Sequence, residues 1–193
     1  MSCARVSADD RLRRAAPAAA RLFLALWPDE GERAALAAWC ARTQWPPTCS
    51  PVRSERLHLT LHFIGALERS RLSELSEALE VAFSPFRVGF SGAELWPRGL
   101  LVLPARELPI ELARLHSLLA DALRRLGLPV EKRRFRPHVT LARHAPAAIA
   151  AKQPAPADWL INDYVLVESL LGGAGGYQIV RRYAARLARA EQG

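Results

Sequence analysis

Two copies of one short motif carry the residues in this chain best suited to chemistry. Leu57-His58-Leu59-Thr60-Leu61 and Pro137-His138-Val139-Thr140-Leu141 share the pattern His, apolar, Thr, Leu, and they lie 80 residues apart. Five His and four Thr placed at random in this chain would give about 0.1 His-x-Thr triplets. Two such triplets therefore indicate a functional repeat.

Paired imidazoles suit a reaction that moves two protons. Histidine has an unperturbed pKa of about 6.5, so one ring can take a proton from a nucleophile while the other gives a proton to a leaving group. In-line displacement at phosphorus places these two oxygens on opposite sides, so the two rings should face each other across a cleft. Threonine hydroxyls beside them can donate hydrogen bonds to the phosphoryl oxygens. The pattern predicts phosphoryl chemistry that needs neither metal nor cofactor.

A β-strand would place each His and Thr pair correctly, because side chains two residues apart point to the same face. His58 then shares a polar face with Thr60, and His138 shares one with Thr140. The opposite face of the first strand is expected to pack in the core and consists of Leu57, Leu59, Leu61 and Phe63. Each strand thus presents an imidazole and a hydroxyl on one face, while apolar residues on its other face pack in the core.

The elements that must carry these strands are helices and strands in mixed order. Strands are expected at residues 21–27, 57–63, 86–90, 100–103, 137–143, 164–171 and 177–183. Helices are expected at 29–42, where Asp29 and Glu32 can form a capping box, at 70–79 with Ser70 as the cap, and at 110–126 before Gly127. Residues 145–158 read as a loop. The order predicts an α+β protein made of two related halves.

Composition limits the class of protein further. The chain has 193 residues, is 50% hydrophobic and has a formal net charge of +8. No apolar run approaches the roughly 18 residues of a membrane helix, and the basic start of the chain is a poor secretion signal. We expect a flexible tail at residues 1–20 followed by a single domain at 21–193. Three cysteines without close spacing favour a reducing cytoplasm over a disulfide framework.

The motifs and their surroundings resemble the two-histidine (2H) phosphoesterase superfamily, and within it the RNA 2′,3′-cyclic phosphodiesterase family, also called 2′-5′ RNA ligase. The likeness covers about residues 21–186. Besides the two motifs it includes the opening strand Arg21-Leu22-Phe23-Leu24-Ala25-Leu26, the Phe-x-Gly at residues 63–65 and the run Arg134-Phe135-Arg136 into the second motif. It implies a bilobal fold of two antiparallel sheets related by pseudo-two-fold symmetry, with helices outside and a central cleft.

The resemblance also implies a reaction and a set of roles. The reaction is hydrolysis of a terminal 2′,3′-cyclic phosphate to a 2′-phosphate. His58 would be the proton donor to the departing 3′-oxygen, and His138 the proton acceptor that activates water. Thr60 and Thr140 would hold phosphoryl oxygens. The implied partner is RNA or a nucleotide with a cyclic phosphate end, with no membrane and no obligate protein partner, and 2′-5′ ligation would be a secondary activity.

Two further candidates for substrate binding carry a difficulty. Arg143 would add charge beside the phosphate, but strict alternation puts it on the face opposite His138. Either a strand end or a bulge re-aims it, or the residue is structural. Phe135, in the basic run from Lys132 to Arg136, either stacks on a nucleobase or packs against the protein.

Three more histidines lie outside the two motif positions. Alternation puts His62 on the same strand face as His58, as a residue lining the site. These two could instead ligate zinc, although no third and fourth ligand is evident. His116 in a helix and His144 at a loop are expected to be ordinary polar residues. An alternative from another class is a non-catalytic RNA-binding module that holds phosphates on the basic run at 132–136.

Overall fold

The protein is an antiparallel α+β structure. The computed structural model describes residues 18–43, 45–146, 158–170 and 176–186, so most of the expected tail lies outside the described residues. Strand β1 (Ala19–Leu26) begins two residues earlier than expected and therefore includes the end of that segment. Among the helices within these ranges, none combines the length and the hydropathy needed to span a membrane.

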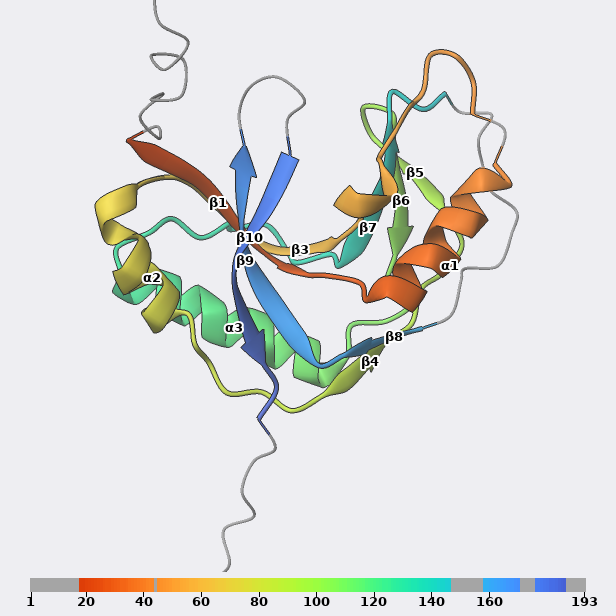
Figure 1. Ribbon diagram of the computed structural model, residues 1–193. Coiled ribbons are helices and arrows are strands. Elements are labelled where there is room, and N and C mark those ends of the chain that lie inside the picture. Colours follow the sequence, from red (N-terminus) through yellow and green to blue (C-terminus); the bar gives the residue numbers. More distant parts are fainter. Residues whose placement is uncertain (1–17, 44, 147–157, 171–175, 187–193) are drawn as a thin grey trace, which may run out of the picture.

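One antiparallel sheet, with eight strands among the described residues, forms the centre of the molecule (Figure 1). Its strand order is β10-β9-β1-β3-β7-β6-β5, and β2 pairs with β7. The strands are β2 (Ser50–Pro51), β3 (Leu59–Glu68), β5 (Glu94–Trp96), β6 (Leu100–Pro104), β7 (His138–Arg143), β9 (Asp163–Leu170) and β10 (Gly176–Ala184). A separate pair is formed by β4 (Phe86–Val88) and β8 (Trp159–Ile161).

The sheet has two halves with a narrow junction. Strand β3, described over its full length like β7, pairs with it at one position only, Leu59 opposite Val139. The family resemblance implies two separate sheets, whereas the structure joins both halves at the two residues that separate His from Thr in the motifs. This junction places both motifs at the same point of the sheet.

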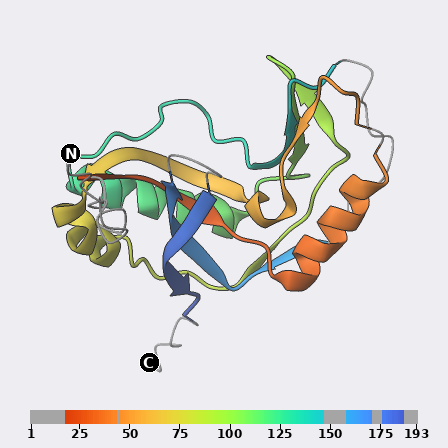
Figure 2. The ribbon, with the colours of Figure 1, turned by 45° about the horizontal axis from the view of Figure 1, so that its top comes forward.

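Helices cover the sheet from both ends of the molecule, with α1 (Glu30–Ala41) at one end and α2 (Leu72–Ala78) and α3 (Ile110–Arg125) at the other (Figure 2). Helix α1 begins with the expected capping box, in which Asp29 Oδ1 accepts from the Glu32 N–H at 2.7 Å and Glu32 accepts from the Asp29 N–H at 2.9 Å. Helix α3 ends before Gly127, whose φ of 70° suits glycine. The expected cap at Ser70 is wrong, because short 3-10 turns, η2 (Ser54–Arg56) and η3 (Arg69–Arg71), precede β3 and α2, and Ser70 lies inside η3.

The main core lies between the sheet and its helices. Helix α3 buries a stripe with helical spacing, Leu112, Leu115, Leu119 and Leu123, and α1 buries Leu36 and Trp39. A smaller cluster, Phe23, Ala25, Val165 and Val167, packs with Trp27 and Ile179. Strand β1 therefore has apolar packing on both faces, as its nearly continuous apolar sequence requires.

Candidate active site

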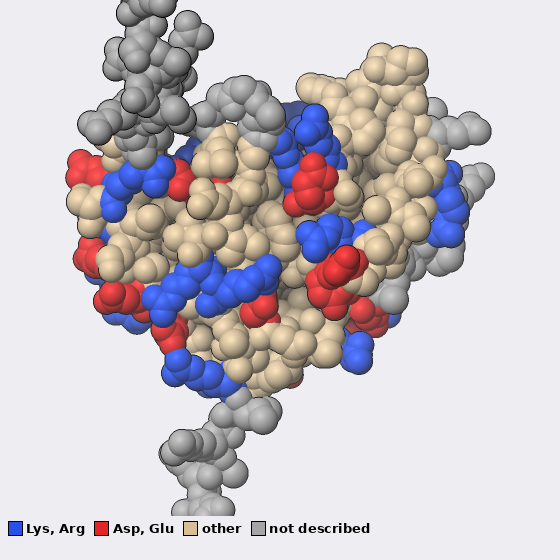
Figure 3. All heavy atoms as spheres, in the orientation of Figure 1, with Lys and Arg blue, Asp and Glu red and all other residues tan. Residues whose placement is uncertain are grey.

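A groove of about 570 Å³ contains both sequence motifs. His58 and Thr60 line it from the first half of the sheet, and His138 and Thr140 line it from the second. The structure thus brings together five of the six predicted site residues, because Arg143 also lines the groove. Figure 3 shows Lys and Arg side chains gathered at the upper centre of this face, between the two halves of the molecule.

Each motif histidine is held in the same way by its own strand. His58 Nδ1 lies 2.7 Å from the Arg56 carbonyl oxygen, and His138 Nδ1 lies 2.7 Å from the Arg136 carbonyl oxygen. Because a carbonyl only accepts, both Nδ1 atoms carry the proton, which leaves Nε2 of each ring as the atom available for proton transfer. In both motifs the acceptor is the backbone carbonyl two residues before the histidine, a group that any residue type provides.

Aromatic rings surround His58. Trp27 stacks on it with ring centroids 5.3 Å apart, while Phe23 and Tyr177 lie at 5.0 and 5.4 Å. Burial lowers the pKa of His58 to about 4, and the positive charges of His138 and Arg143 act in the same direction, against the bond to the Arg56 carbonyl. The free site therefore holds a neutral imidazole at position 58 near pH 7.

His138 has a more open setting. Trp96 packs against it at 4.6 Å, donates from Nε1 to Glu94 at 2.9 Å, and carries the Arg136 guanidinium over its ring at 4.2 Å. Trp96 therefore packs against the protein, and its neighbour is the site histidine. Burial also lowers the pKa of His138, opposed by the bond to the Arg136 carbonyl.

A β-bulge in each motif strand changes which side chains enter the groove. Leu61 has no partner between the pairs Ala25–Thr60 and Leu24–His62, and Leu141 has none between Val102–Thr140 and Leu101–Ala142. One extra residue reverses the alternation that follows it. The fifth residue after each histidine, Phe63 in one strand and Arg143 in the other, therefore lines the groove.

The bulges settle two expectations. The bulge required to re-aim Arg143 is present. The predicted positions of His62 and Phe63 are wrong, because His62 turns into the core and is 3% exposed, while Phe63 is 70% exposed at the groove. His58 and His62 thus lie on opposite faces, and among the described residues no cluster of His, Cys, Asp or Glu is arranged to hold a metal.

Phe135 lies outside the groove. Its ring stacks on His116 with centroids 4.0 Å apart and planes 17° apart, and it packs against the main core. Phe135 therefore does not line the groove. Of the two alternatives, stacking on a nucleobase and packing against the protein, the structure favours packing.

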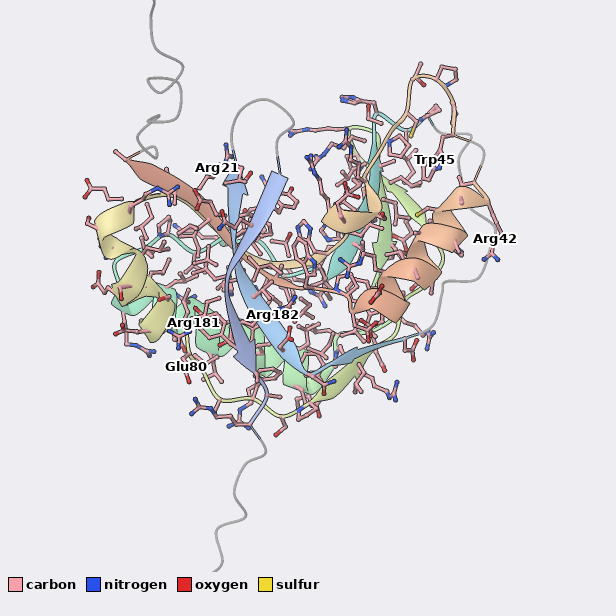
Figure 4. All side chains as sticks on the ribbon, in the orientation of Figure 1. Arg21, Arg42, Trp45, Glu80, Arg181 and Arg182 are labelled. Atoms are coloured by element: carbon pink, nitrogen blue, oxygen red, sulfur yellow. The ribbon has the colours of Figure 1, made fainter. Side chains whose placement is uncertain are left out.

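The groove is strongly cationic. Its described lining includes Arg21, Arg53, Arg56 and Arg143 and contains no Asp or Glu. Figure 4 shows Arg21 at the upper side of the molecule, whereas Arg181 and Arg182 lie lower on β10, where they bond Glu80 and Asp163. Sequence patterns do not point to Arg21, Arg53 or Arg56, since 25 arginines spread along a chain give no local signal.

Known structures share this fold. A structure of Escherichia coli LigT complexed with 3′-AMP superposes with a TM-score of 0.79 at 26% identity, covering 88% of this chain and 99% of that one. A Thermus thermophilus structure, TT0787, has a TM-score of 0.74 at 28% identity, covering 86% and 98%. Both likenesses extend over most of the chain.

The sequence comparisons identify the family. The model of the 2′-5′ RNA ligase superfamily matches residues 32–170, so the chain belongs to that superfamily, which confirms the resemblance of the two motifs. An RNA 2′,3′-cyclic phosphodiesterase of Escherichia coli K12 is 31% identical over 170 residues, covering 85% of this chain and 96% of that protein. A Thermus thermophilus protein of the same name is 31% identical, covering 86% and 90%.

Proposed function

We propose that this chain is an RNA 2′,3′-cyclic phosphodiesterase that opens the cyclic phosphate to a 2′-phosphate. The observation that carries the proposal is the pair of imidazoles, each fixed through Nδ1 to a backbone carbonyl and each lining one cationic groove from its own half of the sheet. The names of the relatives support the same reaction.

Two proton transfers complete the reaction. His138 Nε2 takes a proton from a water molecule as its oxygen attacks phosphorus, and the bond from phosphorus to the 3′-oxygen breaks. His58 Nε2–H gives its proton to that oxygen, which leaves as the 3′-hydroxyl. The product is a 2′-phosphate, with one water consumed and both rings ready for proton exchange with solvent. Positioned proton transfer of this kind contributes roughly 10²- to 10⁴-fold to rate.

Three side chains hold the phosphoryl group. Thr60 and Thr140 donate hydroxyl hydrogen bonds to its non-bridging oxygens, and Arg143 adds positive charge where negative charge increases in the transition state. No metal or cofactor takes part in this scheme, because the two rings provide both proton transfers and the arginines provide the charge.

For His58 to act as the acid, bound substrate must raise the pKa of its imidazole. Burial and nearby cations hold its pKa at about 4 in the free site. An anionic phosphate entering beside the ring favours the imidazolium and raises this pKa. Substrate binding and proton uptake are therefore coupled at His58.

The two halves of the site match position by position. His, Thr and the fifth residue after His enter the groove from each strand after a bulge at the same place, and each Nδ1 bonds the carbonyl two residues earlier. We infer a pseudo-two-fold relation between the halves of one domain that begins near residue 19 and needs no second protein.

Ligation of 2′-5′ linked RNA is the reversal of this chemistry, with a hydroxyl in place of water. It is proposed as a weak second activity, since water outcompetes a dilute hydroxyl. The same groove would accept an oligonucleotide end or a mononucleotide, because both present the same ring.

The test is incubation with adenosine 2′,3′-cyclic phosphate and with a cyclic-ended oligonucleotide, in excess chelator, scoring 2′- against 3′-phosphate. We expect the 2′-phosphate, undiminished by chelator and lost in His58→Ala and His138→Ala while both variants stay folded. Salt-sensitive RNA binding without any product would favour the non-catalytic RNA-binding module. Formation of the 3′-phosphate would reverse the assignment of the leaving oxygen.

A further inference from the structure

Behind the groove, three rings form one continuous stack. His62 of β3 stacks on His116 of α3 with centroids 4.0 Å apart at 24°, and His116 stacks on Phe135 with centroids 4.0 Å apart at 17°. None of the three lines the groove. The chemistry proposed above uses none of them, although two are imidazoles and one is among the most buried polar side chains described.

Hydrogen bonds tie the stack to the bulge in β3. His62 Nε2 lies 2.8 Å from the His116 carbonyl oxygen, so Nε2 donates. The His116 ring in turn bonds the backbone of Leu61, and since this bond raises the pKa of His116, its acceptor is the Leu61 carbonyl. Leu61 is the bulged residue with no partner in β1. The imidazole thus satisfies a backbone group beside an irregularity in the ladder.

The far end of the stack reaches the second motif. Phe135 immediately precedes Arg136, whose carbonyl oxygen holds His138 Nδ1 at 2.7 Å. At the near end, Leu61 directly follows Thr60, which lines the groove. The row of rings therefore connects the two motifs. It begins beside Leu61, which follows Thr60, and it ends at Phe135, which precedes the Arg136 carbonyl that orients His138.

We propose that His116, packed between His62 and Phe135, is a positioning residue that fixes the two motif strands relative to each other for the reaction. This inference rests on the proposed function for its kinetic consequence. An aliphatic side chain at 116 would fill the same space but would leave the Leu61 carbonyl without its donor and Phe135 without a flat surface to stack on.

The charges around the stack agree with a neutral pair. Burial lowers the pKa of both rings, to about 4 for His116. The positive charge of Arg124, which lies on α3 with His116, lowers the pKa of both rings further. Within the described part of the chain, no carboxylate acts on either ring to favour its protonation. Both rings are therefore neutral near pH 7 and pack as flat polar surfaces.

The experiment compares four variants for kcat and KM on adenosine 2′,3′-cyclic phosphate. His116→Ala removes the central ring, and Phe135→Leu removes the half-buried end of the stack without opening the core. Ser117→Ala changes the next, exposed residue of α3 and serves as the surface control. Leu123→Val trims the buried face two turns further along α3 and serves as the control for lost stability.

We expect kcat to fall about tenfold or more in His116→Ala and in Phe135→Leu, with KM changed less than about threefold, because displaced catalytic groups cost rate more than binding. The double variant should be no slower than the slower single one, since both act through one stack. Both controls should keep wild-type kcat. Unchanged kcat in folded His116→Ala, multiplicative losses in the double variant, or an equal loss in Leu123→Val would overturn the inference.

A second readout does not depend on turnover. In the wild-type protein the His138 Nδ1–H proton, held by the Arg136 carbonyl, should give a slowly exchanging resonance. We expect this resonance to broaden or vanish in His116→Ala and in Phe135→Leu, and to persist in Ser117→Ala. If wild-type protein shows no hydrolysis, the proposed function fails, and this resonance alone decides the positioning role; its persistence in both stack variants would refute it.

Discussion

The two groove histidines differ in how far they are removed from water. Phe23, Trp27 and Tyr177 surround His58, whereas Trp96 is the ring described beside His138. Both backbone acceptors favour the charged ring, yet burial outweighs them at each position. The two motifs thus hold both imidazoles by the same backbone hydrogen bond but expose them to water to different degrees. Different solvation is how two copies of one residue can take different proton-transfer roles.

The first prediction concerns the pH dependence of the reaction. In the proposed reaction the productive free form has His58 protonated and His138 neutral. The pKa of each is below 6.5, and that of His58 is about 4. Between the two apparent pKa values the productive form is most populated, so kcat/KM should peak below pH 6.5. Because bound phosphate raises both values, kcat should peak at a higher pH. Initial rates across about pH 4 to 9 measure this; a kcat/KM maximum above pH 7 would contradict it.

The second prediction concerns Arg143. Removing its charge in Arg143→Ala should reduce kcat/KM by about tenfold to a hundredfold, because a charge-assisted contact to the phosphoryl group is lost, and Arg143→Lys should recover part of it. The control is Arg125→Ala, an exposed arginine of α3 away from the groove. Steady-state rates at low and high salt check this prediction, and equal rates for Arg143→Ala and Arg125→Ala would exclude Arg143 from the site.

At the level of strands and helices, periodicity explains which elements can be predicted. Helices α1 and α3 repeat apolar residues at helical spacing and have clear ends, Asp29 for one and Gly127 for the other, so the sequence predicts both nearly to the residue. Strands β5 and β8 have three residues each, too few to show a period, and the sequence predicts neither. Strand β4 is equally short, but its alternation continues to Phe90, so the sequence does predict it; β5 and β8 are defined only by partners elsewhere in the sequence.

The bulges mark the limit of reading a strand by alternation. Nothing in Leu59 to Phe63 distinguishes a regular strand from a bulged one, so alternation assigns His62 to the groove and Phe63 to the core, the reverse of their actual positions. At Arg143 a bulge is expected only because the family resemblance gives that residue a role. The face of a residue beyond a bulge depends on pairing with β1 or β6, which local sequence does not encode.

The third prediction concerns the capping box of α1. Asp29→Ala removes the side-chain acceptor at the helix start and should lower the free energy of unfolding by about 1 kcal/mol. Asp29→Asn keeps an acceptor in the same place and is the matched control. Urea unfolding of both variants measures the difference, and equal midpoints for the Ala and Asn variants would show that the cap adds nothing.

Across the whole molecule, the histidines make stability depend on pH. His58, His62, His116 and His138 all have pKa values lowered on folding, so the unfolded chain binds more protons than the folded one below pH 6.5. Their contribution is therefore intact above about pH 6.5 and is lost progressively as the pH falls toward 4. Packing around these rings is most secure when they are uncharged.

The fourth prediction follows from this linkage. The Tm should fall as pH is lowered from about 6.5 to 4, and it should fall less steeply in His116→Phe, which keeps a ring in the stack but cannot take up a proton. Scanning calorimetry of both proteins over this range gives the comparison. Parallel curves for wild type and variant would show that His116 does not contribute to the acid sensitivity.

The single pairing of Leu59 with Val139 has a consequence for alignment. These two residues directly follow His58 and His138 in the chain, so one backbone contact between the halves of the sheet positions both motifs. A shift of register at this contact would displace His58 and Thr60 relative to His138 and Thr140. The shape of the groove between the two threonines therefore depends on one pair of apolar residues that do not line it.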